Sequence, residues 1–87
     1  MILVKKYLYE ILKALERDGE LCTLDIMRRV GGSKYNMVIK EALVFAENRG
    51  LVHKNKGQKN TKIYSLSEKG QKFLECAKEL EKILGVL

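Results

Sequence analysis

The hydrophobic residues at the start of the chain recur every three or four positions, which predicts a helix. This helix falls within residues 1–17, begins at about residue 2 and ends before Asp18-Gly19, a C-terminal stop signal. Its core stripe consists of Val4, Leu8, Ile11 and Leu15. Because Leu3, Tyr7 and Leu12 make the apolar surface wider than one core face requires, we expect Leu3 and Tyr7 to contact a second subunit.

Residues 23–49 have the pattern of two helices around a tight turn. Thr23 is a good N-cap for a short helix over about residues 24–30, and Gly31-Gly32 ends that helix. Ser33 can cap a longer helix that continues to Arg49. The inward face of the longer helix carries Val38, Ile39, Ala42, Leu43, Phe45 and Ala46. Its opposite face carries Asn36, Met37, Lys40, Glu41 and Val44.

After Gly50 the hydrophobic period changes, which predicts a two-stranded hairpin over residues 51–66 with a polar, glycine-containing tip. The alternation places Tyr64 and Leu66 toward the core and Lys62 toward solvent, with Ile63 facing outward. This register is open by one residue.

Ser67 is the expected cap of a long C-terminal helix within residues 67–87. Its apolar residues follow alternating steps of four and three, as in a short heptad seam. The seam consists of Phe73, Ala77, Leu80, Leu84 and Leu87, with Cys76 and Ile83 beside it. Since the helix stays apolar beyond what a small core needs, we expect it to pair with a second copy; covering its own core is the alternative.

The composition is that of one folded domain. Of 87 residues, 46% are hydrophobic and 32% are charged, whereas disordered chains are poorer in large apolar residues. No apolar run approaches the roughly 20 residues that cross a bilayer. Met1-Ile2-Leu3-Val4 lacks the order of regions found in a signal peptide. We therefore expect one domain over residues 1–87, located in the cytoplasm without membrane contact.

The excess positive charge lies in two segments that contain no acidic residue. Residues 26–40 carry Arg28, Arg29, Lys34 and Lys40, and residues 51–66 carry Lys54, Lys56, Lys59 and Lys62. The net charge of the whole chain is +6, so the remaining residues are slightly acidic. Two such segments are the electrostatic footprint of a protein that binds a polyanion. A merely solvated hairpin, whose lysines prevent aggregation, is the alternative.

The sequence offers no catalytic or metal-binding constellation. His53 is the lone histidine, and together with Cys22 and Cys76 it gives only three scattered ligands without the short spacing of a zinc site. We expect no enzymatic activity, no metal and no cofactor. The two cysteines are expected to be free thiols, with a disulfide within or between chains left open.

Two segments resemble the winged helix-turn-helix superfamily, especially small MarR-like or PadR-like transcriptional regulators of archaea, bacteria or archaeal viruses. Asn48-Arg49-Gly50-Leu51-Val52 is similar to the turn from recognition helix into wing in that family. Tyr64-Ser65-Leu66-Ser67-Glu68-Lys69-Gly70 is similar to its wing-to-helix segment. The resemblance covers nearly the whole chain. It implies a mainly α fold with a small β-hairpin, in the order α-α-α-β-β-α, and a long C-terminal helix.

The resemblance also implies a homodimer, a wing formed by Lys54 to Lys62, and a groove-facing stretch made of Ser33, Lys34, Tyr35, Asn36, Met37, Lys40 and Glu41. Asn36 can pair with adenine, and Lys40 with guanine or a phosphate. The wing lysines are expected to position the DNA rather than to read it. The chain departs from the family in having Glu41, and no arginine, in this stretch. Its length leaves little room for an effector pocket.

The resulting hypothesis is a homodimeric regulator of transcription that binds double-stranded DNA at the nucleoid, or in the host cytoplasm if the source is a virus. The expected DNA contacts are Arg28, Arg29, Ser33, Lys34, Tyr35, Asn36, Met37, Lys40, Lys54, Lys56, Lys59 and Lys62. The expected dimer contacts are Leu3, Tyr7, Phe73, Cys76, Ala77, Leu80, Ile83, Leu84 and Leu87. Two alternatives stay open: an architectural chromatin protein with little sequence preference, and a winged-helix module that binds protein.

Overall fold

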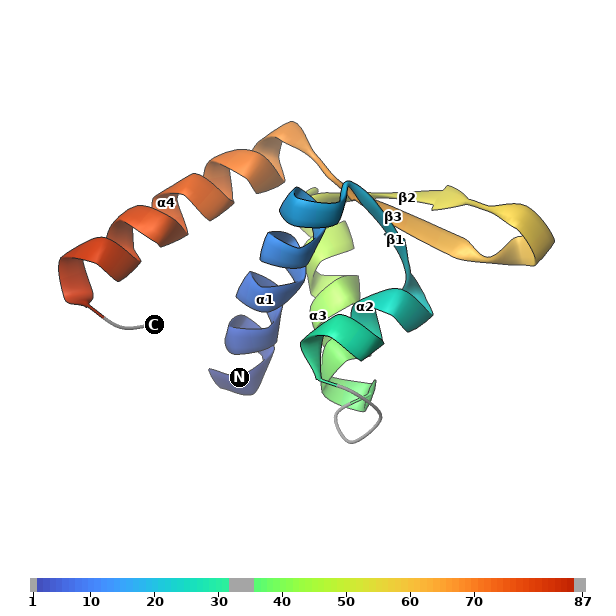
Figure 1. The fold of residues 1–87 in the computed structure, drawn as a ribbon, viewed down its shortest axis with the longest axis horizontal. Helices are drawn as coiled ribbons and strands as arrows, with labels where there is room; N and C mark the ends of the chain where they lie inside the picture. The colour runs from blue at the N-terminus through green and yellow to red at the C-terminus, as the bar shows by residue number, and fades with distance from the viewer. Residues whose placement is uncertain (1, 32–35, 86–87) are drawn as a thin grey trace.

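The computed structural model describes residues 2–31 and 36–85, except for the side chains of residues 2–6 and 60. Its elements are α1 (Ile2–Asp18), β1 (Glu20–Cys22), α2 (Thr23–Val30), α3 (Asn36–Asn48), β2 (Val52–Lys56), the 3₁₀ turn η2 (Gln58–Asn60), β3 (Lys62–Leu66) and α4 (Glu68–Leu84). Helices α1, α2 and α3 form a block, and α4 and the β2–β3 hairpin leave it in opposite directions (Figure 1).

The core is built around α1, which packs against α2, α3, α4 and the sheet. The largest side chains that are fully buried are Ile11, Leu12, Leu15, Ile26, Ile39 and Leu74. Tyr7, which the sequence placed among the dimer contacts, is only 8% exposed in the single chain and belongs to this core. The apolar stripe of α1 is wide because the helix packs against α2, α3, α4 and the sheet.

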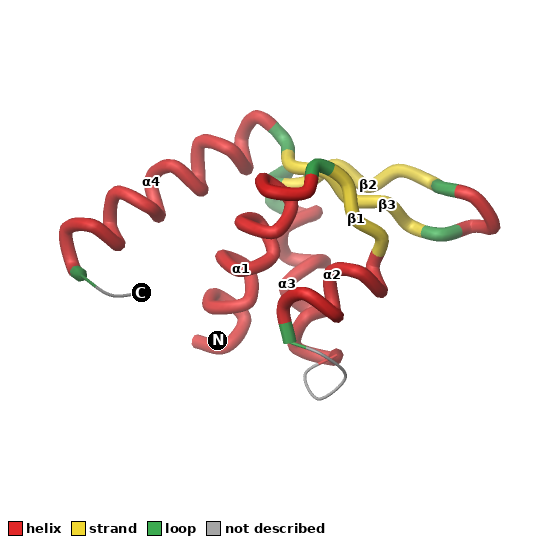
Figure 2. The backbone as a smooth tube through the Cα atoms, viewed as in Figure 1, coloured by secondary structure: helices red, strands yellow, loops and turns green. Residues whose placement is uncertain are grey.

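The sheet has three strands in the order β1-β3-β2, and both pairings are antiparallel (Figure 2). The register predicted for β3 is confirmed, since Tyr64 is buried while Lys62 is exposed. Strand β1 was not predicted, because three residues are too few to display an alternating pattern. Its central residue, Leu21, is buried opposite Tyr64 and extends the core onto the sheet.

The two motifs that resemble the winged-helix family meet where α4 begins. The Ser67 hydroxyl donates to the carbonyl of Gly50 (2.6 Å) and accepts from the N–H of Gly70 (2.9 Å). The Ser67 N–H donates to the carbonyl of Leu51 (3.1 Å). A Cβ on Gly70 would lie 2.0 Å from that carbonyl oxygen, so only glycine fits there. The junction therefore fixes where α4 leaves the hairpin, and the predicted Ser67 cap is confirmed.

Two local details differ from the sequence-based expectation. Cys22, not Thr23, is the N-cap residue of α2, and no side chain caps this helix. In α4, the residue that anchors the helix to the core is Leu74, which is fully buried and lies outside the predicted seam. Of the described seam residues, Ala77 packs against the core, while Phe73, Leu80 and Leu84 are exposed.

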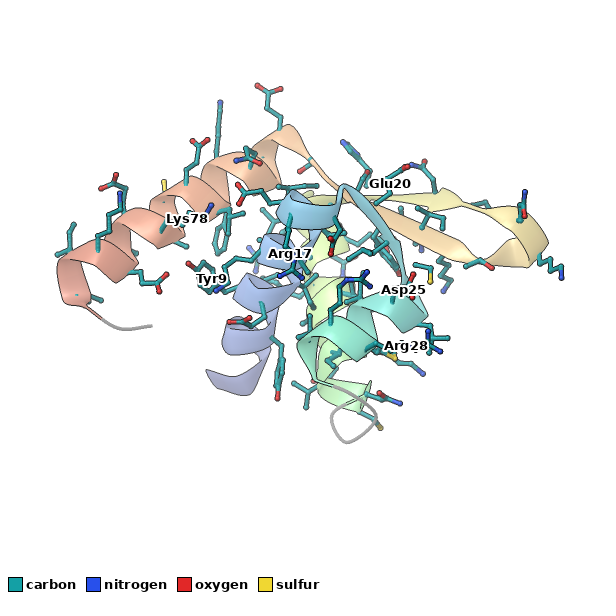
Figure 3. All side chains as sticks on the ribbon, viewed as in Figure 1. Tyr9, Arg17, Glu20, Asp25, Arg28 and Lys78 are labelled. Atoms are coloured by element: carbon teal, nitrogen blue, oxygen red, sulfur yellow. The ribbon has the colours of Figure 1, made fainter. Side chains whose placement is uncertain are left out.

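Three polar contacts hold α4 against α1. The Tyr9 hydroxyl donates to Glu81 Oε2 (2.5 Å), while Lys78 Nζ and Gln71 Nε2 donate to the Glu16 carboxylate at 2.6 and 2.9 Å. Figure 3 shows Tyr9 and Lys78 in the space between the two helices. The hydrogen bonds that Lys78 and Gln71 donate stabilise the charged carboxylate and so lower the pKa of Glu16. These contacts fix the direction of α4 relative to the helical block.

Candidate nucleic-acid interface

The exposed face of α3 carries Met37, Lys40, Glu41 and Val44, at the helical spacing that the sequence predicted. Met37 is 75% exposed and Val44 is 56% exposed. The four residues line one shallow depression of about 430 Å³. On the opposite side, Ile39, Ala42, Leu43 and Ala46 are buried. One face of α3 thus packs in the core, and the opposite face is exposed to solvent.

Asn36, at the start of α3, is half-buried, and its Oδ1 is buried without a hydrogen-bond partner. A bidentate contact with adenine needs this oxygen as acceptor together with the amide nitrogen as donor. The side chain must therefore rotate before it can read a base. Ser33, Lys34 and Tyr35, which were expected to lie beside it, are outside the described residues.

All four lysines of the β2–β3 hairpin are exposed. Residues 51–66 contain no acidic residue, but one of the four lysines has an acidic partner from another element. Lys54 Nζ forms an ion pair with Glu47 Oε1 of α3 at 3.0 Å. The hydrogen bond that Lys54 donates to the Glu47 carboxylate stabilises the charged ammonium and raises the pKa of Lys54. Within residues 2–31 and 36–85, Lys56, Lys59 and Lys62 form no ion pair. These three are the unpaired cations of the hairpin.

The arginines of α2 also have acidic partners within the chain. Arg29 Nε lies 2.9 Å from Asp18 Oδ2 at the end of α1, and Arg28 Nη1 lies 3.8 Å from Asp25 Oδ1. Figure 3 shows Arg28 and Asp25 on the outer side of α2. Residues 26–40 contain no acidic residue, yet both guanidinium groups have a carboxylate close to them in space. Both carboxylates come from outside residues 26–40: Asp18 ends α1, and Asp25 lies in the first turn of α2.

Glu47 is a residue of this surface that the sequence analysis missed. It joins the C-terminal half of α3 to the base of the hairpin through Lys54. Its position follows Lys40 and Val44 at helical spacing, so the same periodicity that marked the exposed face includes it. The structure thereby brings the α3 face and the hairpin, predicted separately, into one connected surface.

The apolar surface of α4 is the second candidate site. Phe73 is 42% exposed, Leu80 54%, Ile83 76% and Leu84 68%, and Cys76 is also exposed. Ala77 packs against the core. A groove of about 430 Å³ runs beside the helix, and its lining is Leu8, Tyr9, Phe45, Phe73, Ala77, Leu80 and Leu84. Leu87 and the side chain of Leu3 lie outside the described residues.

Phe45 is a further difference from the predicted α3 core face. It is 36% exposed and lines the groove beside α4. The guanidinium carbon Cζ of Arg49 lies over the Phe45 ring, 5.0 Å from the ring centroid. Its helical position is at the edge of the buried face, where the core ends and the groove begins.

The described residues contain no cluster of three His, Cys, Asp or Glu side chains that could bind a metal ion. No described helix combines the length and apolarity that a membrane span requires. Cys22 and Cys76 are both free thiols.

Comparison with known proteins identifies the fold. No protein-family profile matches the chain, and no curated protein sequence matches it. Among solved structures it is similar to the PcaV transcriptional regulator from Streptomyces coelicolor, determined in complex with its natural ligand. The TM-score is 0.71 at 21% sequence identity, over 90% of this chain and 59% of the PcaV chain.

This chain has the winged helix-turn-helix fold. This likeness confirms the winged-helix fold that the sequence resemblance predicted. In this fold α2 and α3 are the helix-turn-helix and the β2–β3 hairpin is the wing. The chain spans 59% of the length of the PcaV chain.

Proposed function

We propose that this winged-helix protein is a homodimeric transcriptional regulator of the nucleoid, which places α3 in the major groove of double-stranded DNA and the wing on the flanking backbone or minor groove. The observation that carries the proposal is the connected surface of α3 and wing, exposed on a fold that PcaV uses as a transcriptional regulator. Helix-turn-helix proteins read DNA with this second helix.

The unpaired wing lysines support the contact with DNA. Lys56, Lys59 and Lys62 are exposed on both strands and the tip of the hairpin, where each can approach a phosphate. A cation that binds a phosphate releases a condensed counterion, which makes affinity depend on salt. Lys54 and Arg29 contribute less in this proposal, because a carboxylate of the chain already neutralises each of them.

The exposed apolar side of α4 supports the homodimer. Ile83 and Leu84 are among the most exposed large hydrophobic side chains of the described residues, and they lie at the end of α4 farthest from the wing. Burying them against a second copy would remove apolar surface from water. Dimers of helix-turn-helix proteins bind half-sites about one helical turn, or roughly 34–36 Å, apart.

The test is selection of bound duplexes from a random pool, using the full chain. The proposal predicts enrichment of an inverted repeat, because a two-fold symmetric dimer reads two copies of one half-site. Duplexes bound without any enriched sequence would instead support an architectural protein, for which the missing arginine and Glu41 are the favouring observations. Failure to bind any duplex at low salt would contradict both and leave a protein-binding module.

A further inference from the structure

Two apolar side chains on the exposed face of α3 are largely uncovered by the described residues. Met37 and Val44 are separated by two helical turns and therefore project from the same side. With 75% and 56% of their surfaces exposed, they contribute little to the core. An apolar group held in water gains free energy when a partner covers it.

The surroundings of Met37 and Val44 restrict which partner can cover them. Lys40 and Glu41 lie between them in the same shallow depression. The wing, with its unpaired lysines, is joined to the same helix face through the ion pair of Glu47 with Lys54. A complementary partner must therefore be anionic along its edges and must offer small apolar groups at its centre. The major groove of DNA fits, because phosphates border it and thymine 5-methyl groups project into it.

Other means of reading bases are poorly represented on this face. Residues 33–41 contain no arginine, the side chain that most often reads guanine. The Oδ1 atom of Asn36 is buried, so the bidentate contact with adenine is not preformed. Apart from Lys40, which can contact guanine or a phosphate, apolar contact is the mode of readout for which the exposed side chains of the described residues are already in place.

We propose that Met37 and Val44 determine sequence specificity by contacting thymine 5-methyl groups in the major groove. This inference rests on the proposed function. Seven residues of helix rise about 10.5 Å, and stacked base pairs are about 3.4 Å apart. For a helix that lies along the groove, the two contacted thymines are therefore about three base pairs apart within one half-site.

The experiment uses the duplex selected by the wild-type protein. Each thymine in turn is replaced by deoxyuracil, which removes only the methyl group, and the dissociation constant is measured by fluorescence anisotropy at fixed salt. Loss of one buried methyl should weaken binding about four-fold. The effect should occur at two positions of each half-site, and uracil outside the bound region should have no effect.

Protein variants assign each methyl to its side chain. Met37→Ala should abolish the sensitivity at one position and Val44→Ala at the other, while the affinity for the fully substituted duplex stays close to that of the wild type. Leu24→Ala is the matched control, because Leu24 is an exposed apolar residue (55%) on α2 rather than on the α3 face. Thermal unfolding of each variant checks that the fold is retained.

The outcomes separate this inference from the function on which it rests. If the protein binds a selected duplex and no uracil substitution weakens binding, the methyl readout is wrong while DNA binding stands. The same holds if the sensitivity persists in both alanine variants. If no duplex is bound at all, the proposed function and the methyl readout both fail.

Discussion

At the scale of single residues, Gly70 is the described glycine at which an added Cβ would meet the closest contact. A methyl group there would meet the Leu51 carbonyl oxygen at 2.0 Å and the Leu66 side chain at 2.9 Å. The backbone must move to relieve the first contact, because a carbonyl in the junction cannot rotate away. Gly70→Ala should therefore lower the free energy of unfolding by about 3 kcal/mol, at the upper end of overpacking penalties.

Urea denaturation measures this change directly. Glu79→Ala, on the exposed side of α4, is the control and should change stability by no more than about 0.5 kcal/mol. Equal stabilities of Gly70→Ala and wild type would show that α4 does not approach the wing as closely as described.

Lys59 has an unfavourable backbone conformation and a positive charge that, in the proposed function, contacts a DNA phosphate. Its φ of 55° is in the left-handed region, the one such residue besides glycine in the described parts of the chain. Lys59→Gly should remove the cost of about 1 kcal/mol that a side chain pays in this backbone conformation, and should raise Tm by roughly 4–8 °C. It should also weaken DNA binding, since one phosphate contact is lost.

Lys56→Gly is the matched comparison for Lys59. It removes the same charge from β2, where the backbone is extended, so it should weaken DNA binding without raising Tm. A gain in Tm for both variants, or for neither, would argue against strain at the wing tip.

At the scale of elements, the α1–α4 contact links stability to pH. The hydrogen bond from Tyr9 to Glu81 raises the pKa of Tyr9 from 10.0 to about 12. The folded state thus holds this proton more tightly than the unfolded state. The contribution of Tyr9 is fully present below pH 10 and is lost as pH rises from 10 to about 12.

Tyr9→Phe and Glu81→Gln test this linkage. Because other groups also titrate at high pH, the relevant quantity is the difference from the wild type in the free energy of unfolding between pH 9 and 12. Both variants should lose less stability over this interval than the wild type does. Parallel curves for all three proteins would show that the Tyr9 hydroxyl does not bond to Glu81 in solution.

The hydrophobic period of the sequence predicts most of the helices and strands, but not all of them. Helices and hairpin were predictable because each buries one face, and burial imposes a repeat on the sequence. Strand β1 was not, because a three-residue strand shows no repeat. Leu74 was missed for another reason: in a helix with apolar residues on two sides, spacing does not identify which side meets the core.

The candidate site was predictable to a lesser degree than the fold. Exposure of Met37 and Lys40 follows from their place opposite the buried face of α3. The pairing of Lys54 with Glu47, and of Arg29 with Asp18, depends on how separate elements are brought together. Counting charge along the chain therefore identified the basic segments but overestimated how many of their cations are free.

At the scale of the whole molecule, the proposed homodimer makes DNA affinity depend on α4. Ile83→Glu places a charge on the exposed apolar side of this helix without touching the core of one chain. Sedimentation should then report a monomer, and cooperative thermal unfolding should show that the single domain is still folded. Binding to the selected inverted repeat should fall at least ten-fold, because two half-sites are no longer bound as one unit.

Leu24→Glu introduces the same charge at a similarly exposed apolar residue of α2 and serves as the control. It should leave the assembly state unchanged. A wild-type protein that sediments as a monomer at all concentrations used for DNA binding would contradict the dimer.

The measurement that tests the central claim most directly is the salt dependence of affinity for duplex DNA, compared among the wild type, Lys56→Glu and Lys72→Glu. The two variants change net charge equally, but Lys72 lies on α4, the helix that leaves the block in the direction opposite to the hairpin. Each phosphate contact contributes about −0.9 to the slope of log K against log salt. We predict that Lys56→Glu reduces the slope by about one such contact and weakens binding, while Lys72→Glu retains the wild-type slope. Equal effects of both variants, or affinity that does not depend on salt, would contradict a DNA interface formed by α3 and the wing.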